Sequence, residues 1–242
     1  MIALLTDFEH GDGLGVMKGL IKSISPAAEI IDLYNHIGHY NVRSGAWILL
    51  KDCAFFPKGT VFCCVVDPGV GSSRKAVAIK TANYFFVGPD NGLMYPAASS
   101  DKIECIVQLD TSSGSKTFHG RDVFAPAAAR LDNGVSIGEL GVGMSQLQKL
   151  EIAAVDGNGE IVLIDHYGNV ITNIPQAESK GSYEVSCSNF KNNLKFRSTY
   201  AEAVDVELFV IEGSKNTLEL SVKQGSAAET LGCSVGNKIT IR

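Results

Sequence analysis

The amino-acid sequence predicts an α/β fold in which a mostly parallel sheet flanked by helices is followed by a smaller, barrel-like all-β domain. Up to about residue 150, apolar β-branched runs alternate with segments of helical periodicity, which is the order of a parallel sheet covered by helices. The remaining chain consists of short alternating runs separated by Gly, Asn and Ser, which is typical of antiparallel strands. We therefore expect an α/β domain over residues 1–150 and a β-rich domain over residues 151–242.

Strands and helices alternate along the first 66 residues. Strands are expected at residues 2–6, 29–34 and 60–66, and helices at residues 14–24 and 42–56. The first helix follows from the helical spacing of Leu14, Met17, Ile21 and Ile24, and Pro26 ends it. Pro57 ends the second helix in the same way. This order indicates a largely parallel sheet.

The pattern then becomes mixed. Two strands are expected at residues 76–80 and 84–87, and another at residues 103–109. A helix that contains Val123, Phe124, Ala127, Ala128 and Leu131 ends at Asn133-Gly134. In the second domain, strands are expected at residues 160–165, 169–174, 182–187, 206–211, 217–223 and 238–242, with a short helix at residues 227–231.

The composition narrows the class of protein. With 45% hydrophobic and 19% charged residues, the 242-residue chain has ample material for a packed core. A net charge of −5 and the absence of a Lys/Arg run argue against a nucleic-acid surface. The six cysteines form no CxxC pair, and no apolar run approaches the roughly 20 residues that span a bilayer. The sequence therefore predicts a soluble, cytoplasmic protein without nucleic-acid or membrane partners.

The segment Thr60–Arg74 has the most informative chemical pattern. A buried strand runs into Asp67, a Pro-Gly-Val-Gly turn follows, and Arg74 comes after the turn. Open α/β sheets bind ligands at the carboxyl ends of their strands, so the acid and the guanidinium are expected beside a crevice. A structural ion pair that caps the strand explains these two residues equally well.

Further polar residues lie at strand or loop ends of the first domain, namely Asp7, Asp12, Asn91, His119 and Asp122. Each alone has a structural explanation, such as a turn cap or a solvated side chain. Together they gather where a parallel sheet opens its crevice, and an Asp, an Arg and a His can hold a water molecule for attack. His119 is also expected just before a helix amino terminus, which favours an anionic guest.

Motifs for other chemistries are missing from the sequence. It contains no Walker loop, no GxGxxG after a strand, no GxSxG and no HExxH. His36 and His39 lie three residues apart on an expected loop without a third ligand, so no metal site is predicted there. A metal-dependent phosphoesterase that uses Asp and His is the remaining metal-based alternative.

Five separated motifs, in this order, resemble those of the SAM hydroxide adenosyltransferase family. They are Thr6-Asp7-Phe8 with Asp12, residues 65–71 (VVDPGVG) with Arg74, residues 89–92 (PDNG), residues 118–122 (FHGRD) with 124–127 (FAPA), and residues 165–169 (DHYGN) with 172–174 (TNI). The resemblance covers nearly the whole chain. It implies hydrolysis of S-adenosyl-L-methionine (SAM) to adenosine and L-methionine by attack of water or hydroxide on the ribose C5′, without cofactor or metal ion.

The resemblance also implies a role for each matching residue. Asp67, Arg74 and His119 match an Asp-Arg-His triad that holds the attacking water. Asp7 matches an acid at the ribose hydroxyls, Tyr40 an aromatic that walls the ribose, Tyr200 an aromatic near adenine, and Asn169 the side chain that reads adenine. Asp12 and Asp165 match acids at the methionine ammonium, and Ser214 and Lys215 the pair at its carboxylate. The family's sites lie between subunits, so a homotrimer is implied.

Departures from the family pattern lie mainly toward the methionine end. Glu9 replaces a usual Gly, Leu14 a Tyr or Ser, and Gly213-Ser214-Lys215-Asn216 a more usual Asn-Ser-x-Gly.

Two alternatives to a hydrolase stay open. A related SAM-dependent halogenase needs a halide pocket of Tyr, Thr and Ser, whereas this chain has Asp67, Val70 and Gly120 there, and an acid repels a halide. A catalytically silent adenosine- or SAM-binding module would keep the fold, but the complete triad argues against it.

Overall fold

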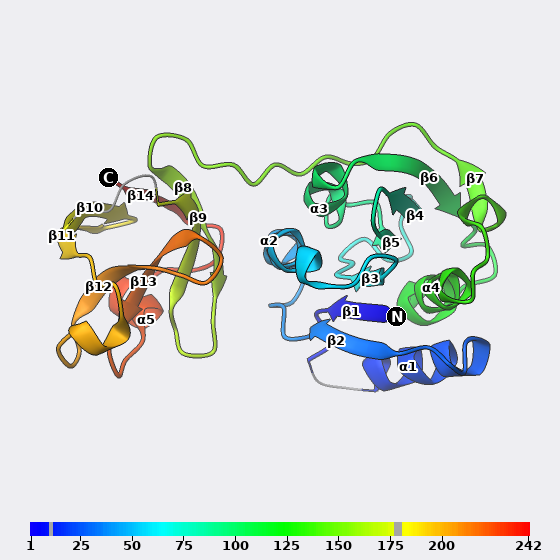
Figure 1. Cartoon of the computed structure of the whole chain (residues 1–242), viewed down its shortest axis with the longest axis horizontal. Helices are drawn as coiled ribbons and strands as arrows, with labels where there is room; N and C mark the ends of the chain where they lie inside the picture. Colours follow the sequence, from blue (N-terminus) through cyan, green and yellow to red (C-terminus); the bar gives the residue numbers. More distant parts are fainter. Residues whose placement is uncertain (10–11, 177–180) are drawn as a thin grey trace. The chain divides into compact units, whose positions relative to one another are not determined.

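The computed structural model describes residues 1–9, 12–176 and 181–242, which form two compact units (Figure 1). The first unit is Met1–Glu151 and the second is Ile152–Arg242. No helix in the described ranges is both long and apolar enough to cross a lipid bilayer. Each unit has its own sheet and its own apolar core.

A seven-stranded sheet in the order β2-β1-β3-β5-β4-β6-β7 forms the centre of the first unit (Figure 1). Its strands are β1 (Ile2–Thr6), β2 (Ile30–Tyr34), β3 (Val61–Val65), β4 (Ala76–Thr81), β5 (Phe85–Pro89), β6 (Ile103–Leu109) and β7 (Gly141–Gly143). The adjacent strands β2, β1, β3 and β5 run parallel, as the sequence predicts. β4 pairs antiparallel with β5, because the short connection between them allows a hairpin but no crossover. The pairings of β4 with β6 and of β6 with β7 are also antiparallel. The sheet is therefore mixed, with the parallel order confined to one half.

Helices cover both faces of this sheet (Figure 1). α1 (Gly13–Ile24) and α4 (Ala125–Asp132) pack together over one face, and α2 (Val42–Asp52) and α3 (Tyr95–Ser100) contact each other over the opposite face. The core beneath α1 and α4 contains Ile2 and Leu4 of β1 with Met17 and Phe124. Since successive side chains of a strand point to opposite faces, the fully buried run of β1 supplies both layers.

Two helix boundaries differ from the sequence-based expectation. The helix predicted to reach Phe56 ends at Asp52, and a 3₁₀ turn, η1 (Cys53–Phe55), completes the segment before Pro57. The helix predicted near Val123 begins at Ala125, after a π-helical turn, η2 (Gly120–Phe124), that follows His119. Single π-helical turns are frequent at functional sites. A further 3₁₀ turn, η3 (Ile137–Glu139), precedes β7.

The second unit is an antiparallel sheet in the order β11-β10-β14-β8-β9-β13-β12. Its strands are β8 (Asn158–Ile164), β9 (Val170–Pro175), β10 (Ser182–Cys187), β11 (Phe190–Lys195), β12 (Leu208–Glu212), β13 (Thr217–Val222) and β14 (Lys238–Ile241). Phe196, just after β11, bridges to Val210 of β12, so the two edge strands of the sheet meet. The nearly closed sheet confirms the expected barrel-like domain. α5 (Ala227–Leu231) is present as predicted, and a 3₁₀ turn, η4 (Tyr200–Glu202), precedes β12.

An aromatic cluster fixes β3, the strand that leads into the site. Phe62 is fully buried and stacks on Phe86 with a centroid distance of 5.3 Å, and Phe56 and Tyr84 approach it edge-on at 5.3 and 5.5 Å. Such pairs add stability beyond the area that they bury.

We predict that Phe62→Ala lowers the free energy of unfolding by about 3–5 kcal/mol, because it leaves a cavity in this cluster. Urea denaturation measures the loss. Phe55→Ala is the matched control, since Phe55 is 84% exposed and its removal is expected to change stability by less than about 0.5 kcal/mol. Equal effects of the two substitutions would contradict the assignment of Phe62 to the core.

Candidate active site

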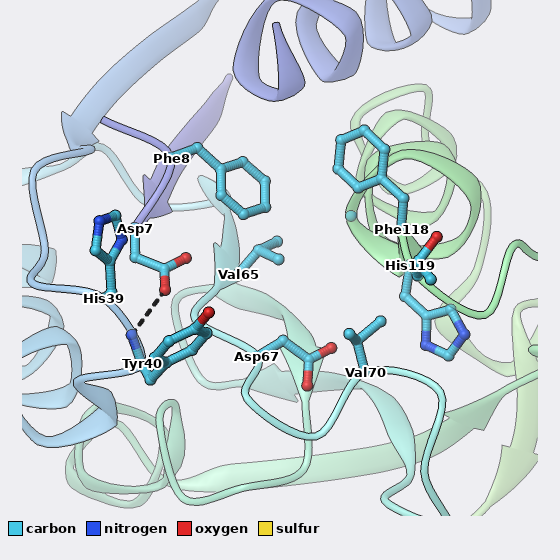
Figure 2. Close-up of a pocket in the computed structure, with 11 residues that line it drawn as sticks. Asp7, Phe8, His39, Tyr40, Val65, Asp67, Val70, Phe118 and His119 are labelled. Atoms are coloured by element: carbon cyan, nitrogen blue, oxygen red, sulfur yellow. Dashed lines mark hydrogen bonds between the residues drawn. The ribbon is translucent and has the colours of Figure 1, made fainter. Parts of the chain in front are cut away.

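A cavity of about 250 Å³ lies at the carboxyl ends of β1 and β3 (Figure 2). Asp7 directly follows β1, and Asp67 lies two residues beyond the end of β3. Because the two strands are parallel neighbours, both acids reach the same edge of the sheet. The cavity is lined by Asp7, Phe8, His39, Tyr40, Val65, Asp67, Val70, Thr117, Phe118, His119 and Gly120. Figure 2 shows Asp7 and Tyr40 on the side opposite His119, with Asp67 between them.

The turn after Asp67 is stabilised by its own hydrogen bonds and packs against the segment before His119. The Val70 amide donates to the Asp67 carbonyl at 3.2 Å, and the Ser72 amide donates to the Gly69 carbonyl at 3.1 Å. Gly71 has a φ of +75°, and a Cβ there would overlap the carbonyl oxygen of Lys116. Only glycine combines this conformation with so close an approach. The turn is thereby seated against the chain that carries His119.

Arg74 joins Asp67 to His119. Its Nε donates to Asp67 Oδ1 at 2.9 Å, and its Nη2 donates both to Asp67 Oδ2 and to Nδ1 of His119, the latter at 2.6 Å. The side chains of Asp67 and Arg74 are 7% and 10% exposed. The guanidinium carbon also lies 5.3 Å from the centre of the Phe124 ring. The expected ion pair therefore exists, and it forms part of a buried three-residue network with His119.

The network fixes the protonation of His119. A guanidinium only donates hydrogen bonds, so Nδ1 must accept, and the proton of the neutral ring lies on Nε2. Burial and the charge of Arg74 lower the pKa of His119, and the opposing effects of Asp67 and Asp122 are smaller. His119 is consequently a neutral hydrogen-bond donor at neutral pH.

Tyr40 is held in an unusual conformation by Asp7. The Tyr40 amide donates to Asp7 Oδ2 at 3.0 Å, the contact dashed in Figure 2. Its φ is +63°, which is rare for a residue with a bulky side chain, and 71% of the residue is exposed. Strained residues of this kind concentrate at ligand sites. Asp7 therefore positions the aromatic ring at the mouth of the cavity.

Three of the polar residues expected at this site belong neither to the cavity wall nor to the network of Asp67, Arg74 and His119. Asp12 is exposed at the amino-terminal cap of α1, where its side chain makes no capping bond. Asn91 ties a turn to β3, since its Nδ2 donates to the Val66 carbonyl and its Oδ1 accepts from the Leu93 amide. Asp122 pairs with Arg121 and accepts from the Ser115 amide. Asn91 and Asp122 therefore have structural roles in local turns, which was the alternative explanation for these two residues.

The sequence motifs contain Phe8, Val65 and Phe118, but sequence reasoning assigned none of these three residues a role in the cavity wall. Phe8 and Phe118 meet edge to face at 5.8 Å, and Val65 and Val70 complete the wall. The signal was available, because Phe8 and Phe118 directly follow or precede Asp7 and His119 in the chain.

The second unit has two cavities of its own. The larger, of about 640 Å³, is lined by Asp165, Tyr167, Asn169, Tyr200, Val222, Lys223, Gln224, Gly225 and Ser226. The smaller, of about 360 Å³, is lined by Leu163, Asp165, Ile171, Tyr200, Ile211, Glu212, Gly213, Ser214, Lys215 and Glu219. Asp165 and Tyr200 line both. The five substrate-binding residues expected in this domain therefore lie around two adjoining cavities.

Asp165 organises the turn between β8 and β9. Its Oδ1 accepts from the amides of Tyr167 and Asn169, each at 2.9 Å, and its Oδ2 accepts from the Asn169 side chain at 2.9 Å. Gly168 in this turn has a φ of +79° and packs directly against Ser226. The carboxylate of Asp165 is thus oriented by three N–H donors before any ligand binds.

Models of two known domains match this chain over most of its length. The SAM hydroxide adenosyltransferase N-terminal domain matches residues 2–141, and the C-terminal domain of the same family matches residues 159–240. The chain belongs to the SAM hydroxide adenosyltransferase family. The resemblance inferred from five motifs is confirmed.

Relatives of this family match the chain from end to end. It is 33% identical to an (R)-S-adenosyl-L-methionine hydrolase of Thermus thermophilus, over 99% of this chain and 98% of the relative. It is also 33% identical to the hydrolase of the same name from Methanocaldococcus jannaschii, over 100% and 95% of the two chains. A crystal structure of an uncharacterized conserved protein from Thermotoga maritima superposes with a TM-score of 0.91 at 34% identity, covering 100% of this chain and 99% of the other. A fluorinase of Actinopolyspora mzabensis is more distant, at 24% identity over 100% and 96% of the two chains.

The potential metal-ligating side chains of the described residues do not form a metal site. Within residues 1–9, 12–176 and 181–242, no group of three or more His, Cys, Asp or Glu side chains is placed to hold an ion. All six cysteines are free thiols, and burial raises the pKa of Cys63, on β3, to about 12. This thiol is a packing residue without nucleophilic character.

We predict that nitrogen NMR of the histidine rings detects His119 as the Nε2–H tautomer, with a titration midpoint below the ordinary value of about 6.5. The signal can be assigned by its loss in His119→Gln. A proton on Nδ1, or a midpoint above the ordinary value, would contradict the hydrogen bond from Arg74.

Proposed function

We propose that this chain hydrolyses SAM to adenosine and L-methionine, by in-line attack of a water molecule on the ribose C5′. The observation that carries the proposal is the buried Asp67–Arg74–His119 network, with two of its members facing a cavity that Asp7 also lines. Full-length similarity to proteins named (R)-S-adenosyl-L-methionine hydrolase supports this assignment.

The chemistry needs little acid–base assistance at the leaving group. A bond forms between the water oxygen and C5′ as the C5′–sulfur bond breaks, and the sulfonium leaves as the neutral thioether of methionine. One proton must leave the attacking water. The protein therefore has to hold the nucleophile behind C5′, shield it from bulk solvent and accept its proton.

The three residues divide these tasks according to their protonation. His119 presents Nε2–H and donates to the water oxygen, whereas its Nδ1 already accepts from Arg74. Of the two members that face the cavity, Asp67 is then the one that can accept the proton. Arg74 does not line the cavity; it is a positioning residue that orients the other two from behind.

The remaining site residues follow the substrate from sugar to amino acid. We assign Asp7 to the ribose hydroxyls, Tyr40 to the ribose wall, Asn169 and Tyr200 to adenine, Asp12 and Asp165 to the ammonium group, and Ser214 and Lys215 to the carboxylate. The five of these residues that belong to the second unit line its 640 Å³ and 360 Å³ cavities, which suits an adenine end and an amino-acid end. A homotrimer with sites between subunits stays a prediction.

The halogenase alternative is disfavoured by the same cavity. The three positions that replace the halide-binding Tyr, Thr and Ser are Asp67, Val70 and Gly120, and all three line it. A carboxylate there repels a halide ion, whereas it accepts a hydrogen bond from water.

The decisive experiment is chromatography of the purified protein after incubation with SAM. We expect adenosine and L-methionine in equal amounts, no 5′-halogenated adenosine when chloride or fluoride is added, and no loss of activity with a chelator. Bound SAM without product would favour a binding module, and inhibition by the chelator would favour metal-dependent chemistry.

We predict that Asp67→Asn and His119→Ala each lower kcat by about a hundredfold or more while the affinity for SAM changes little, because both residues act on the water. Single-turnover kinetics and calorimetry separate the two quantities. Asp110→Asn, at an exposed acid of the same unit, is the matched control and should retain full activity. Normal kcat in both site variants would remove the assignment.

A further inference from the structure

A buried acid on β13 is not used by the site described so far. Glu219 is 8% exposed, and it lines the 360 Å³ cavity. None of the hydrogen bonds among the described residues involves its carboxyl group. Buried carboxyl groups are normally hydrogen-bonded or paired with a cation, because their desolvation is otherwise costly. The position of Glu219 therefore requires a reason other than packing.

Glu219 lies on the outer face of the barrel, and it is buried there by a segment that covers this face. In the antiparallel pairing of β12 and β13, Glu219 lies opposite Ile211 and therefore shares its face. Ile211 belongs to a small apolar cluster with Ala203 and Phe209, separate from the barrel core. Tyr200 packs edge-on against Phe209 at 5.9 Å. The segment around η4 thus covers this face, and Glu219 lies beneath its edge.

The backbone leaves room for this carboxyl group. Gly213 follows β12, and a Cβ at this position would overlap the carboxyl atoms of Glu219. The tight turn to β13 closes with the Gly213 amide donating to the Thr217 carbonyl at 2.9 Å, and with Asn216 at a φ of +57°. The turn that carries Ser214 and Lys215 is therefore built directly against the acid.

Charged and titratable groups face Glu219 from each neighbouring element. Asp165 follows β8, Glu212 ends β12, Lys215 lies in the β12–β13 turn, and Tyr200 belongs to η4. Burial is the main cause that raises the pKa of Glu219 to about 7; the charge of Asp165 adds to it, and Lys215 opposes it. Three acids and one lysine line this cavity, which is therefore short of positive charge.

We propose that Glu219 and Asp165 together bind the primary ammonium group of the substrate's amino-acid end, beside Ser214 and Lys215 at its carboxylate. An ammonium group has three donors and needs several acceptors. The Asp165 oxygens already accept three N–H bonds, so the Glu219 carboxylate is the stronger vacant acceptor in this cavity. This inference rests on the proposed function, because it takes SAM as the ligand.

A proton and the ammonium group then compete for Glu219. Below about pH 7 the acid is largely protonated in the free protein and must lose its proton before it can pair with the ligand. Ligand binding therefore releases a proton in this range, and the affinity for SAM rises with pH until Glu219 is ionised.

The test compares Glu219→Gln with Glu229→Gln, a control at an exposed acid of the same unit that lines neither cavity. Calorimetry at about pH 6 and about pH 8 measures binding of SAM and of 5′-dimethylsulfonio-5′-deoxyadenosine, which keeps the sulfonium and the nucleoside but lacks the amino acid. We expect Glu219→Gln to weaken SAM binding about tenfold or more at the higher pH and to abolish its pH dependence. Binding of the truncated sulfonium should stay unchanged, and Glu229→Gln should resemble the wild type.

Three outcomes would overturn the inference. Normal, pH-dependent SAM binding by Glu219→Gln would show that the acid does not contact the ligand. An equal loss for SAM and the truncated sulfonium would indicate a structural role alone. If the wild-type protein binds neither compound, the proposed function fails as well, so the two failures are distinguishable.

Discussion

The ion pair between Arg74 and Asp67 is the contact on which the first-unit site depends. It satisfies both carboxylate oxygens of a buried acid, and the same guanidinium nitrogen fixes the ring of His119. Removing one partner of such a pair leaves an uncompensated buried charge, which typically costs about 3–5 kcal/mol. The network therefore stabilises the turn after β3 and sets the chemistry at the cavity with the same three side chains.

The parts of the fold that follow from residue pattern were predictable. β1 and β3 are almost wholly apolar because both faces of the parallel sheet are covered, and α1 follows from its helical spacing. α3, β7 and β11 were not expected. α3 and β7 are too short to show a period, and β11 reads Phe-Lys-Asn-Asn-Leu-Lys, a largely polar run. Periodicity does not encode the direction of a strand. The antiparallel direction of β4 follows instead from its short connection to β5.

The candidate site divides in a similar way. Asp7 and Asp67 were predictable at one edge of the sheet, because ligands bind at the carboxyl ends of parallel strands. The motif comparison added His119 from a distant segment. Asn91 and Asp122 were also selected by their positions at strand or loop ends, but their hydrogen bonds stabilise local turns. Glu219 escaped notice because it alternates with leucines in a strand, a pattern that normally places an acid in solvent. The outer face of β13 that carries Glu219 is buried only because the segment around Tyr200 covers it.

The contact between Gly71 and the Lys116 carbonyl has a consequence for how this protein can change over evolutionary time. Arg74 and His119 are separated by 45 residues, yet their two segments abut backbone to backbone with no side chain between them. An insertion or deletion in either segment would have to be matched by a change in the other. We therefore expect the two stretches to change together, and natural variation to accumulate around them, in the outer loops and on the exposed helix faces.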